Sequence, residues 1–276
     1  MRLVTYRGQH GVPSVGRLDD DAVHPQRAPS MTAWLAGEGR VDAGEAVALA
    51  DVTLLAPVPE PPSVRDFYAF EGHVAASWRR RGEPIPEHWY RAPSFYFSNP
   101  ASIVGPGASV RRPAGVAMLD FELEIAAVIG AGGDIAGFTL MNDWSARDLQ
   151  REEVTVLLGP HKSKDFATGL GPWLVTPDEL PYRDGRLHVE GWCAVNGREV
   201  GRGAAAAQHF SWPEIVAQAA RDTRLRPGDV LGSGTLDAGC LLELGTLPGG
   251  RWIEPGDAVT VGAEGLGELT ATVAVP

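Results

Sequence analysis

The 276-residue sequence has few of the features that mark a disulfide-rich or a membrane protein. It contains only two cysteines, Cys193 and Cys240, and both lie in apolar, strand-like stretches, which indicates small core residues and excludes a disulfide framework. No uninterrupted apolar run is long enough to span a bilayer, and the first residues lack the apolar stretch of a secretory signal. We therefore expect no membrane partner and a reducing, cytoplasmic location.

Positive charge is also scarce. Lysine and arginine total 24 against 35 aspartates and glutamates, which gives a formal net charge of -11 and an isoelectric point near 5.1. Nucleic-acid binding needs a basic surface, so this charge balance disfavours a nucleic-acid partner, and we expect none; it does not identify a substrate. The one local basic run, the three arginines at residues 79–81, has two interpretations: a clamp for the carboxylate of a small molecule, or the solvated face of an exposed helix.

The chain divides at a proline-rich stretch. The four prolines of APVPEPPS, residues 56–63, exclude regular structure, and we place the boundary there, between a small N-terminal domain (1–57) and a larger domain (58–276). Periodicity predicts five elements in the first part: strands at 3–7 and 15–18, a short helix capped by Ser30 that runs through Trp34, a second helix near 43–50, and a strand at 52–55.

Beyond residue 63 the pattern is mostly strand. Asn196 and Gly197 separate two strand-like runs and form the Asn-Gly signature of a tight hairpin. Two helices interrupt the strands: one begins at Ser211, which forms a capping box with Glu214, and the other starts near Ser145 and runs to Glu153. The sequence therefore predicts a mainly β (α+β) fold.

The strand DFELEIAAVIG, residues 120–130, carries an acidic alternation. Side chains alternate faces along a strand, so Glu122 and Glu124 share one face and would repel each other at the start of a buried run. A cation between them relieves that cost, and carboxylate oxygens suit magnesium, calcium or manganese. We expect four carboxylates to come into range of one such ion: Asp66, Glu122, Glu124 and Asp143. The alternative is a solvated acidic face.

Six motifs in a fixed order resemble the fumarylacetoacetate hydrolase family. They run from about Asp66 to Glu243 and read DFYAFEGH, DFELEIAAVIG, NDWSARDLQ, KSKDFATGLGPWLVT, GDVLGSGT and GCLLELG. The resemblance implies a mixed β-sandwich/β-roll catalytic domain with a small N-terminal α/β domain, and a homodimer. It also implies a magnesium or calcium ion held by Glu122, Glu124 and Asp143, with Asp66 as fourth ligand.

The resemblance also implies roles for residues around the metal. His73 matches the general base that activates water, and Glu243 matches the glutamate that assists it. The residues that stabilise the oxyanion correspond to Arg147, Gln150 and Lys164, although an ion pair with Asp148 is an alternative role for Arg147. Substrate contacts fall on Arg81, or Arg80 if the alignment shifts by one, on Thr235, and on Phe97, which takes the place of the family's tyrosine beside Tyr96.

The metal ligands occur throughout a superfamily that includes decarboxylases, isomerases, hydratases and hydrolases, whereas Asp66, His73 and Glu243 together favour hydrolysis. We therefore predict a metal-dependent hydrolase that cleaves a carbon–carbon bond in a small-molecule oxo acid, a fumarylacetoacetate- or acylpyruvate-like 1,3-dicarbonyl. Two alternatives stay open: a decarboxylase or isomerase of a 2-oxo diacid on the same scaffold, and a non-catalytic protein that binds a metal or ligand.

Overall fold

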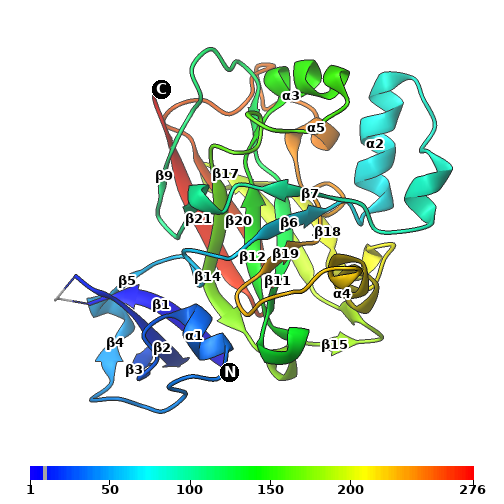
Figure 1. Cartoon of the computed structure of the whole chain (residues 1–276). Helices are drawn as coiled ribbons and strands as arrows, with labels where there is room; N and C mark the ends of the chain where they lie inside the picture. The colour runs from blue at the N-terminus through cyan, green and yellow to red at the C-terminus, as the bar shows by residue number, and fades with distance from the viewer. Residues whose placement is uncertain (9–10) are drawn as a thin grey trace.

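The computed structural model describes residues 1–8 and 11–276, and within these ranges the chain forms two large β-sheets with short helices around them (Figure 1). The larger sheet contains twelve strands in the described residues. Ten of them follow each other in space: β4 (Val47–Ala48), β3 (Ala22–Pro25), β2 (Pro13–Asp19), β1 (Arg2–Arg7), β14 (Thr168–Val175), β12 (Ile135–Asp143), β11 (Leu123–Ile129), β19 (Val230–Gly232), β6 (Val64–Phe67) and β7 (Phe95–Ser98). The other two pair at the side, β5 (Thr53–Leu54) with β1 and β8 (Ile103–Val104) with β14.

The second sheet has five strands among the described residues. Their order is β18 (Arg198–Ala204), β17 (Glu190–Val195), β20 (Ala258–Ala263), β21 (Gly267–Ala274) and β9 (Ser109–Arg111). Two short pairs complete the strands: β10 (Leu119–Asp120) with β13 (Ser145–Ala146), and β15 (Tyr182–Arg183) with β16 (Arg186–Leu187). The helices are α1 (Met31–Leu35), α2 (Glu71–Arg81), α3 (Arg147–Glu153), α4 (Trp212–Ala220) and α5 (Leu241–Leu244). The mainly β fold is thereby confirmed.

Strand β11 is buried on both faces, which explains its unbroken apolar run. On one face Ile125 belongs to the same core cluster as Val261 of the five-stranded sheet. On the other face Val128 belongs to a second cluster that includes Trp34 of α1. A charged side chain at the start of this strand is therefore buried as well, and it needs a compensating partner.

The N-terminal segment matches most of the predicted elements. Strands β1 and β2 pair antiparallel, and the Ser30 side chain accepts the Ala33 N–H at 3.1 Å to cap α1. The helix predicted near residues 43–50 is wrong: Val47 and Ala48 form β4, and residues 49–51 form a single 3₁₀ turn. Pairing of β4 with β3 satisfies this backbone and outweighs the helix propensity of the alanines. Because β1 also pairs with β14, the larger sheet runs through both parts of the chain, and the boundary at residue 57 stays a prediction.

Turn and cap chemistry in the larger part follows the sequence. Asn196 and Gly197 adopt φ values of 53° and 76° between β17 and β18, which is the left-handed geometry of a tight hairpin turn. Glu214 accepts the Ser211 N–H at 2.8 Å at the start of α4. Both cysteines are buried free thiols. In residues 1–8 and 11–276, no helix is long and apolar enough to cross a membrane.

The sheet register brings several strand ends to one edge. Strands β6 and β19 run parallel, with Asp66 opposite Gly232. Strand β11 runs antiparallel to both β19 and β12, so its first residues lie beside the last residues of those strands. Helices α2 and α3 begin shortly after β6 and β12 end, and Figure 1 shows α2, α3 and α5 gathered at one end of the sheets.

Candidate active site

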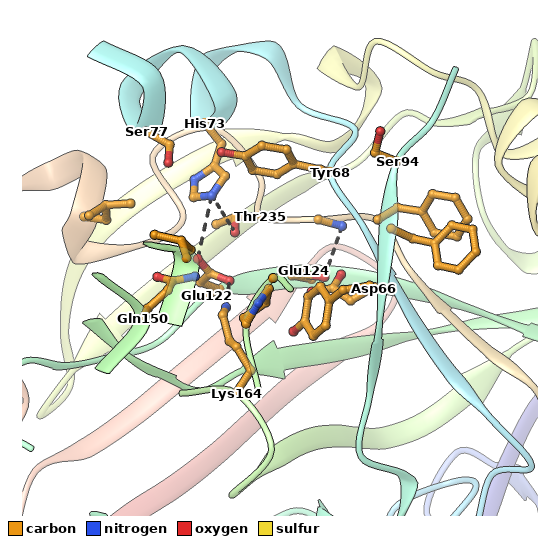
Figure 2. Close-up of a pocket in the computed structure, with 18 of the residues that line it drawn as sticks. Asp66, Tyr68, His73, Ser77, Ser94, Glu122, Glu124, Gln150, Lys164 and Thr235 are labelled. Carbon is orange, nitrogen blue, oxygen red and sulfur yellow. Dashed lines mark hydrogen bonds and ion pairs between the residues drawn. The ribbon is translucent and has the colours of Figure 1, made fainter. Parts of the chain in front are cut away.

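A cavity of about 340 Å³ lies at this edge of the larger sheet (Figure 2). Nine of the predicted site residues line it: Asp66, His73, Arg81, Glu122, Glu124, Arg147, Gln150, Lys164 and Thr235. Asp143 and Glu243 lie just behind this lining, where they contact Lys164 and His73. The fold thus brings together residues that are up to 177 positions apart, 243 minus 66, in one small volume.

Three buried carboxylates form a cluster beside the cavity, two of them in its lining and Asp143 behind it. Asp66, Glu124 and Asp143 each place an oxygen within 4.8 Å of the others. Each also keeps one buried oxygen without a hydrogen-bond partner: Oδ1 of Asp66, Oε1 of Glu124 and Oδ1 of Asp143. Burial raises the pKa of Asp66 and Glu124 well above the usual range, and mutual repulsion within the cluster adds to it.

These residues fit a hard divalent cation. The donor set is oxygen only, and the three orphaned oxygens are the groups that a bound cation would satisfy. Gly232 borders the cluster: a Cβ there would lie 2.7 Å from Oδ1 of Asp66 and 2.9 Å from Oε2 of Glu124. A glycine at this position therefore keeps the space between the carboxylates open.

Glu122 lies beside the carboxylate cluster and not within it. The sequence placed four carboxylates around one cation, but in the structure the oxygens of Glu122 are turned to two cationic side chains. Arg147 Nη2 donates to Oε1 at 2.7 Å, and Lys164 Nζ donates to Oε2. These cations, together with His73, outweigh the effect of burial and hold the pKa of Glu122 below its usual range. Lys164 also donates to Asp143, so it bridges Glu122 to the cluster.

His73 on α2 forms a short contact with a carboxylate. Its Nδ1 lies 2.6 Å from Oε1 of Glu243, and its Nε2 lies 3.4 Å from the Thr235 hydroxyl and 3.7 Å from Oε1 of Glu122. Figure 2 shows the imidazole reaching down from its helix toward Glu122 and Thr235. An ionised carboxylate only accepts hydrogen bonds, so Glu243 keeps the imidazole proton on Nδ1 and leaves the Nε2 lone pair facing the cavity.

Asp120 is a site-organising residue to which the sequence interpretation gave no role. It is fully buried, and its carboxylate accepts the backbone N–H groups of Leu241 and Leu242 at 2.9 and 3.0 Å. It also accepts from Arg147 Nε at 2.9 Å. Asp120 thereby anchors α5, which carries Glu243, to the arginine at the start of α3. The alternation that places Asp120 on the same face as Glu122 was the available signal.

Two of the predicted substrate contacts differ in position: Arg81 lies in the lining of the cavity, and Phe97 does not. Arg81 lines the cavity, with its guanidinium 4.8 Å from the ring centre of Trp78, whereas Arg80 donates to the Leu242 carbonyl. Phe97 is a correction: it is 66% exposed, lies outside the cavity and stacks against Arg65. Tyr96 lines the cavity instead, and its hydroxyl donates to Oδ2 of Asp143 at 2.7 Å. A phenol is therefore present where the sequence interpretation expected none.

The pair Tyr96 and Phe97 provides a direct test. We expect Tyr96→Phe to lower kcat/KM for the 1,3-dicarbonyl acids predicted from the sequence by about tenfold, because the variant loses the hydrogen bond to Asp143, and one hydrogen bond to a charged group is worth roughly 1.5 kcal/mol. Phe97→Leu changes a side chain on the opposite face of β7, so its kinetic constants should match those of the wild type. Steady-state kinetics of both variants checks this. Equal losses in the two variants would contradict the assignment.

The mainly β fold, with a cavity of small-molecule size beside a cluster of carboxylates that fits a divalent cation, is the architecture of an enzyme that acts on small molecules. The family model of the fumarylacetoacetate (FAA) hydrolase C-terminal domain matches residues 63–274, and the chain belongs to the fumarylacetoacetate hydrolase family.

Named relatives and solved structures agree with the family. Fumarylacetoacetase of Oryza sativa subsp. japonica is 30% identical in a match of 263 aligned positions. The match covers 72% of this chain and 60% of that protein, so the chain spans about three-fifths of this relative. The structure of fumarylacetoacetate hydrolase from psychrophilic Exiguobacterium antarcticum matches with a TM-score of 0.79 at 25% identity over all of both chains. That of 5-carboxymethyl-2-hydroxymuconate delta-isomerase from Mycobacterium smegmatis matches with a TM-score of 0.75 at 28% identity, also over all of both chains.

Proposed function

We propose that the protein is a metal-dependent hydrolase that cleaves a carbon–carbon bond in a 1,3-dicarbonyl acid of the fumarylacetoacetate or acylpyruvate type. The observation that carries the proposal is the contact of 2.6 Å between His73 Nδ1 and Glu243, in a cavity that also contains the carboxylate cluster. A base held in one tautomer is needed to activate water and is not needed for simple binding of a metal or ligand.

His73 would remove a proton from water. Its Nε2 faces the cavity with the Thr235 hydroxyl 3.4 Å away, and a water molecule within reach of both can lose a proton to Nε2 as its oxygen attacks a substrate carbonyl. Glu243 then stabilises the imidazolium through the Nδ1 proton. The same imidazolium can return the proton to the carbon that leaves, so the residue acts first as base and then as acid.

The carboxylate cluster and the cationic residues would bind the dicarbonyl acid. A divalent cation held by Asp66, Glu124 and Asp143 would supply Lewis acidity for the carbonyl oxygens. Gln150 accepts from Arg147 Nη1 at 3.1 Å through its amide oxygen, which leaves the amide NH₂ group free to donate into the cavity. Arg81 would hold a distal carboxylate of the substrate.

Product analysis tests the proposal. We expect the purified protein with magnesium to convert acylpyruvates or a fumarylacetoacetate-type diacid into two smaller acids, seen as loss of enol absorbance and as two product masses. Chelator should abolish the reaction and added magnesium should restore it. Turnover that persists in the chelated, metal-free protein would contradict the role given to the carboxylate cluster.

Isomerisation of a 2-oxo diacid is the second candidate. The observation that favours it is the match over all of both chains to the 5-carboxymethyl-2-hydroxymuconate delta-isomerase, at 28% identity against 25% for the fumarylacetoacetate hydrolase. In that reaction the imidazole would move a proton between two carbons of the substrate, and no water would be consumed. A product of unchanged mass would identify isomerisation, and release of carbon dioxide would identify the decarboxylase alternative.

A further inference from the structure

Helix α2, which carries His73, begins without a cap from its own sequence. Its N-cap residue is Phe70, whose side chain cannot accept a hydrogen bond from the first backbone N–H groups. The carboxylate of Asp237 fills this role from a distant segment: its Oδ1 accepts the backbone N–H of His73 at 3.1 Å, across 164 residues of sequence. A carboxylate at a helix N-terminus also interacts favourably with the helix dipole.

Gly72 provides a second, independent indication of this contact. Glycine is a weaker helix former than alanine, and Gly72 is not among the residues with a positive φ that would require it. The reason for glycine is the close approach of the carboxylate: a Cβ on Gly72 would lie 2.4 Å from Oδ1 and 2.6 Å from Cγ of Asp237. The carboxylate of Asp237 therefore occupies the space that a side chain at position 72 would fill.

The segment around Asp237 contacts His73 at three separate atoms. Thr235 approaches Nε2, Asp237 binds the backbone N–H, and Glu243 binds Nδ1. The segment is itself fixed, because the Ala238 N–H donates to Oε2 of Glu243 at 2.8 Å. The carbonyl oxygen of Asp237 also packs against β18, where a Cβ on Gly203 would lie only 2.3 Å from it. Asp237 is the member of this set that holds the backbone of the helix.

We propose that Asp237 is a positioning residue for the base: it fixes the first turn of α2 so that the His73 imidazole stays between Glu243 and Thr235. The proposal rests on the proposed function for the identity of the base. The contact itself does not depend on which substrate is bound, because it joins the first turn of α2 to the segment that follows β19. Asp237 is not among the residues that line the cavity and does not belong to the carboxylate cluster.

Removal of the Asp237 carboxylate should affect turnover more than substrate binding. We expect Asp237→Ala to lower kcat by about 10²-fold, since a shift of about 1 Å in a catalytic group has an effect of that order, with KM nearly unchanged. Asp237→Asn keeps an oxygen that can accept the His73 N–H and should restore most of the activity. Glu71→Gln is the matched control, because Glu71 is an exposed acid in the same first turn and binds Tyr90, not the helix backbone. It should behave as wild type.

Double variants separate positioning from a general loss of stability. In a His73→Ala background the Asp237→Ala change should have no further effect on kcat, because the base that it positions is gone. Gly72→Ala should reproduce the Asp237→Ala defect by displacing the carboxylate, and the two changes combined should be no worse than either alone. An additive loss in these combinations would overturn the proposal.

Proton NMR gives a readout that does not depend on turnover. The Nδ1 proton of His73, hydrogen-bonded to Glu243, should give a downfield resonance in the wild type that is lost in His73→Ala, which assigns it. We expect that resonance to persist in Asp237→Asn and to disappear in Asp237→Ala and Gly72→Ala. If the wild type cleaves no dicarbonyl acid while the resonance still depends on Asp237, the proposed function fails and the positioning stands. An Asp237→Ala protein with wild-type kcat and resonance overturns the positioning alone.

Discussion

The His73→Ala protein is expected to cleave a 1,3-dicarbonyl acid about 10³-fold more slowly than the wild type, within the range that loss of a general base usually gives. The imidazole is buried, and Glu243 fixes its Nδ1 atom. Among the hydrogen bonds of the described residues, Nε2 has one partner within 3.5 Å, the hydroxyl of Thr235. Neither Thr235 nor Glu122 accepts a proton from water at neutral pH as readily as a neutral imidazole. The loss should therefore appear in kcat.

The same variant should still bind its metal. His73 does not belong to the group formed by Asp66, Glu124 and Asp143, so the rise in melting temperature on addition of magnesium should match that of the wild type. His24→Ala, on β3 and far from the cavity in sequence and fold, is the control for loss of a histidine. Wild-type turnover by a metal-bound His73→Ala protein would rule out His73 as the base.

The acidic strand shows how much of the site could be predicted from sequence. Alternation predicted Asp120, Glu122 and Glu124 on one face of a single strand, and the following apolar run correctly indicated burial. In the structure the segment is divided: Asp120 belongs to β10, Glu122 lies between the two strands, and Glu124 belongs to β11. The three residues nevertheless have different sets of partners. Asp120 binds backbone amides of α5 together with Arg147, Glu122 binds Arg147 and Lys164, and Glu124 belongs to the carboxylate cluster. These partners come from segments far along the chain, and a local pattern contains no information about which of them arrives at which position.

The assignment of Phe97 in place of Tyr96 has a different cause. Neighbouring residues of a strand point to opposite faces, so an error of one position exchanges the cavity face for the outer face. The face is set by pairing with β6, where Tyr96 lies opposite Asp66 and Phe97 lies opposite Arg65. That register depends on the folded sheet. The position of Asp66 in the site, once known, fixes Tyr96 as its neighbour on the same face.

The helix expected near residues 43–50 and the homodimer illustrate two further limits. Alanine-rich composition is a local preference, and β4 forms because β3 offers it a pairing partner. An interface between two copies depends on a surface that one chain's sequence does not reveal. The homodimer and the cytoplasmic location therefore stay predictions, whereas the family and the mainly β fold are confirmed.

The Glu124→Gln protein should melt at a lower temperature than the wild type in magnesium and at a higher temperature than the wild type in chelator. In the wild type, saturating magnesium should raise the melting temperature by about 5 °C, because binding at 100 times the dissociation constant stabilises by about 2.7 kcal/mol and about 1 kcal/mol shifts a chain of this size by about 2 °C. Glutamine lacks the charge that holds the cation but keeps an oxygen for the Gly234 N–H, which Glu124 accepts at 3.1 Å. The variant should therefore show no magnesium shift.

In chelator the order should reverse, with the variant melting at a higher temperature than the wild type. Without a cation, three buried carboxylates face each other, and the glutamine removes one of them while leaving the packing unchanged. Calorimetry in magnesium and in chelator measures all four values, with Glu60→Gln as the control at an exposed glutamate. A variant that keeps the magnesium shift would show that Glu124 is not a ligand. A variant less stable than wild type in chelator would instead show that this carboxylate supports the fold without a metal, which the unpartnered Oε1 argues against.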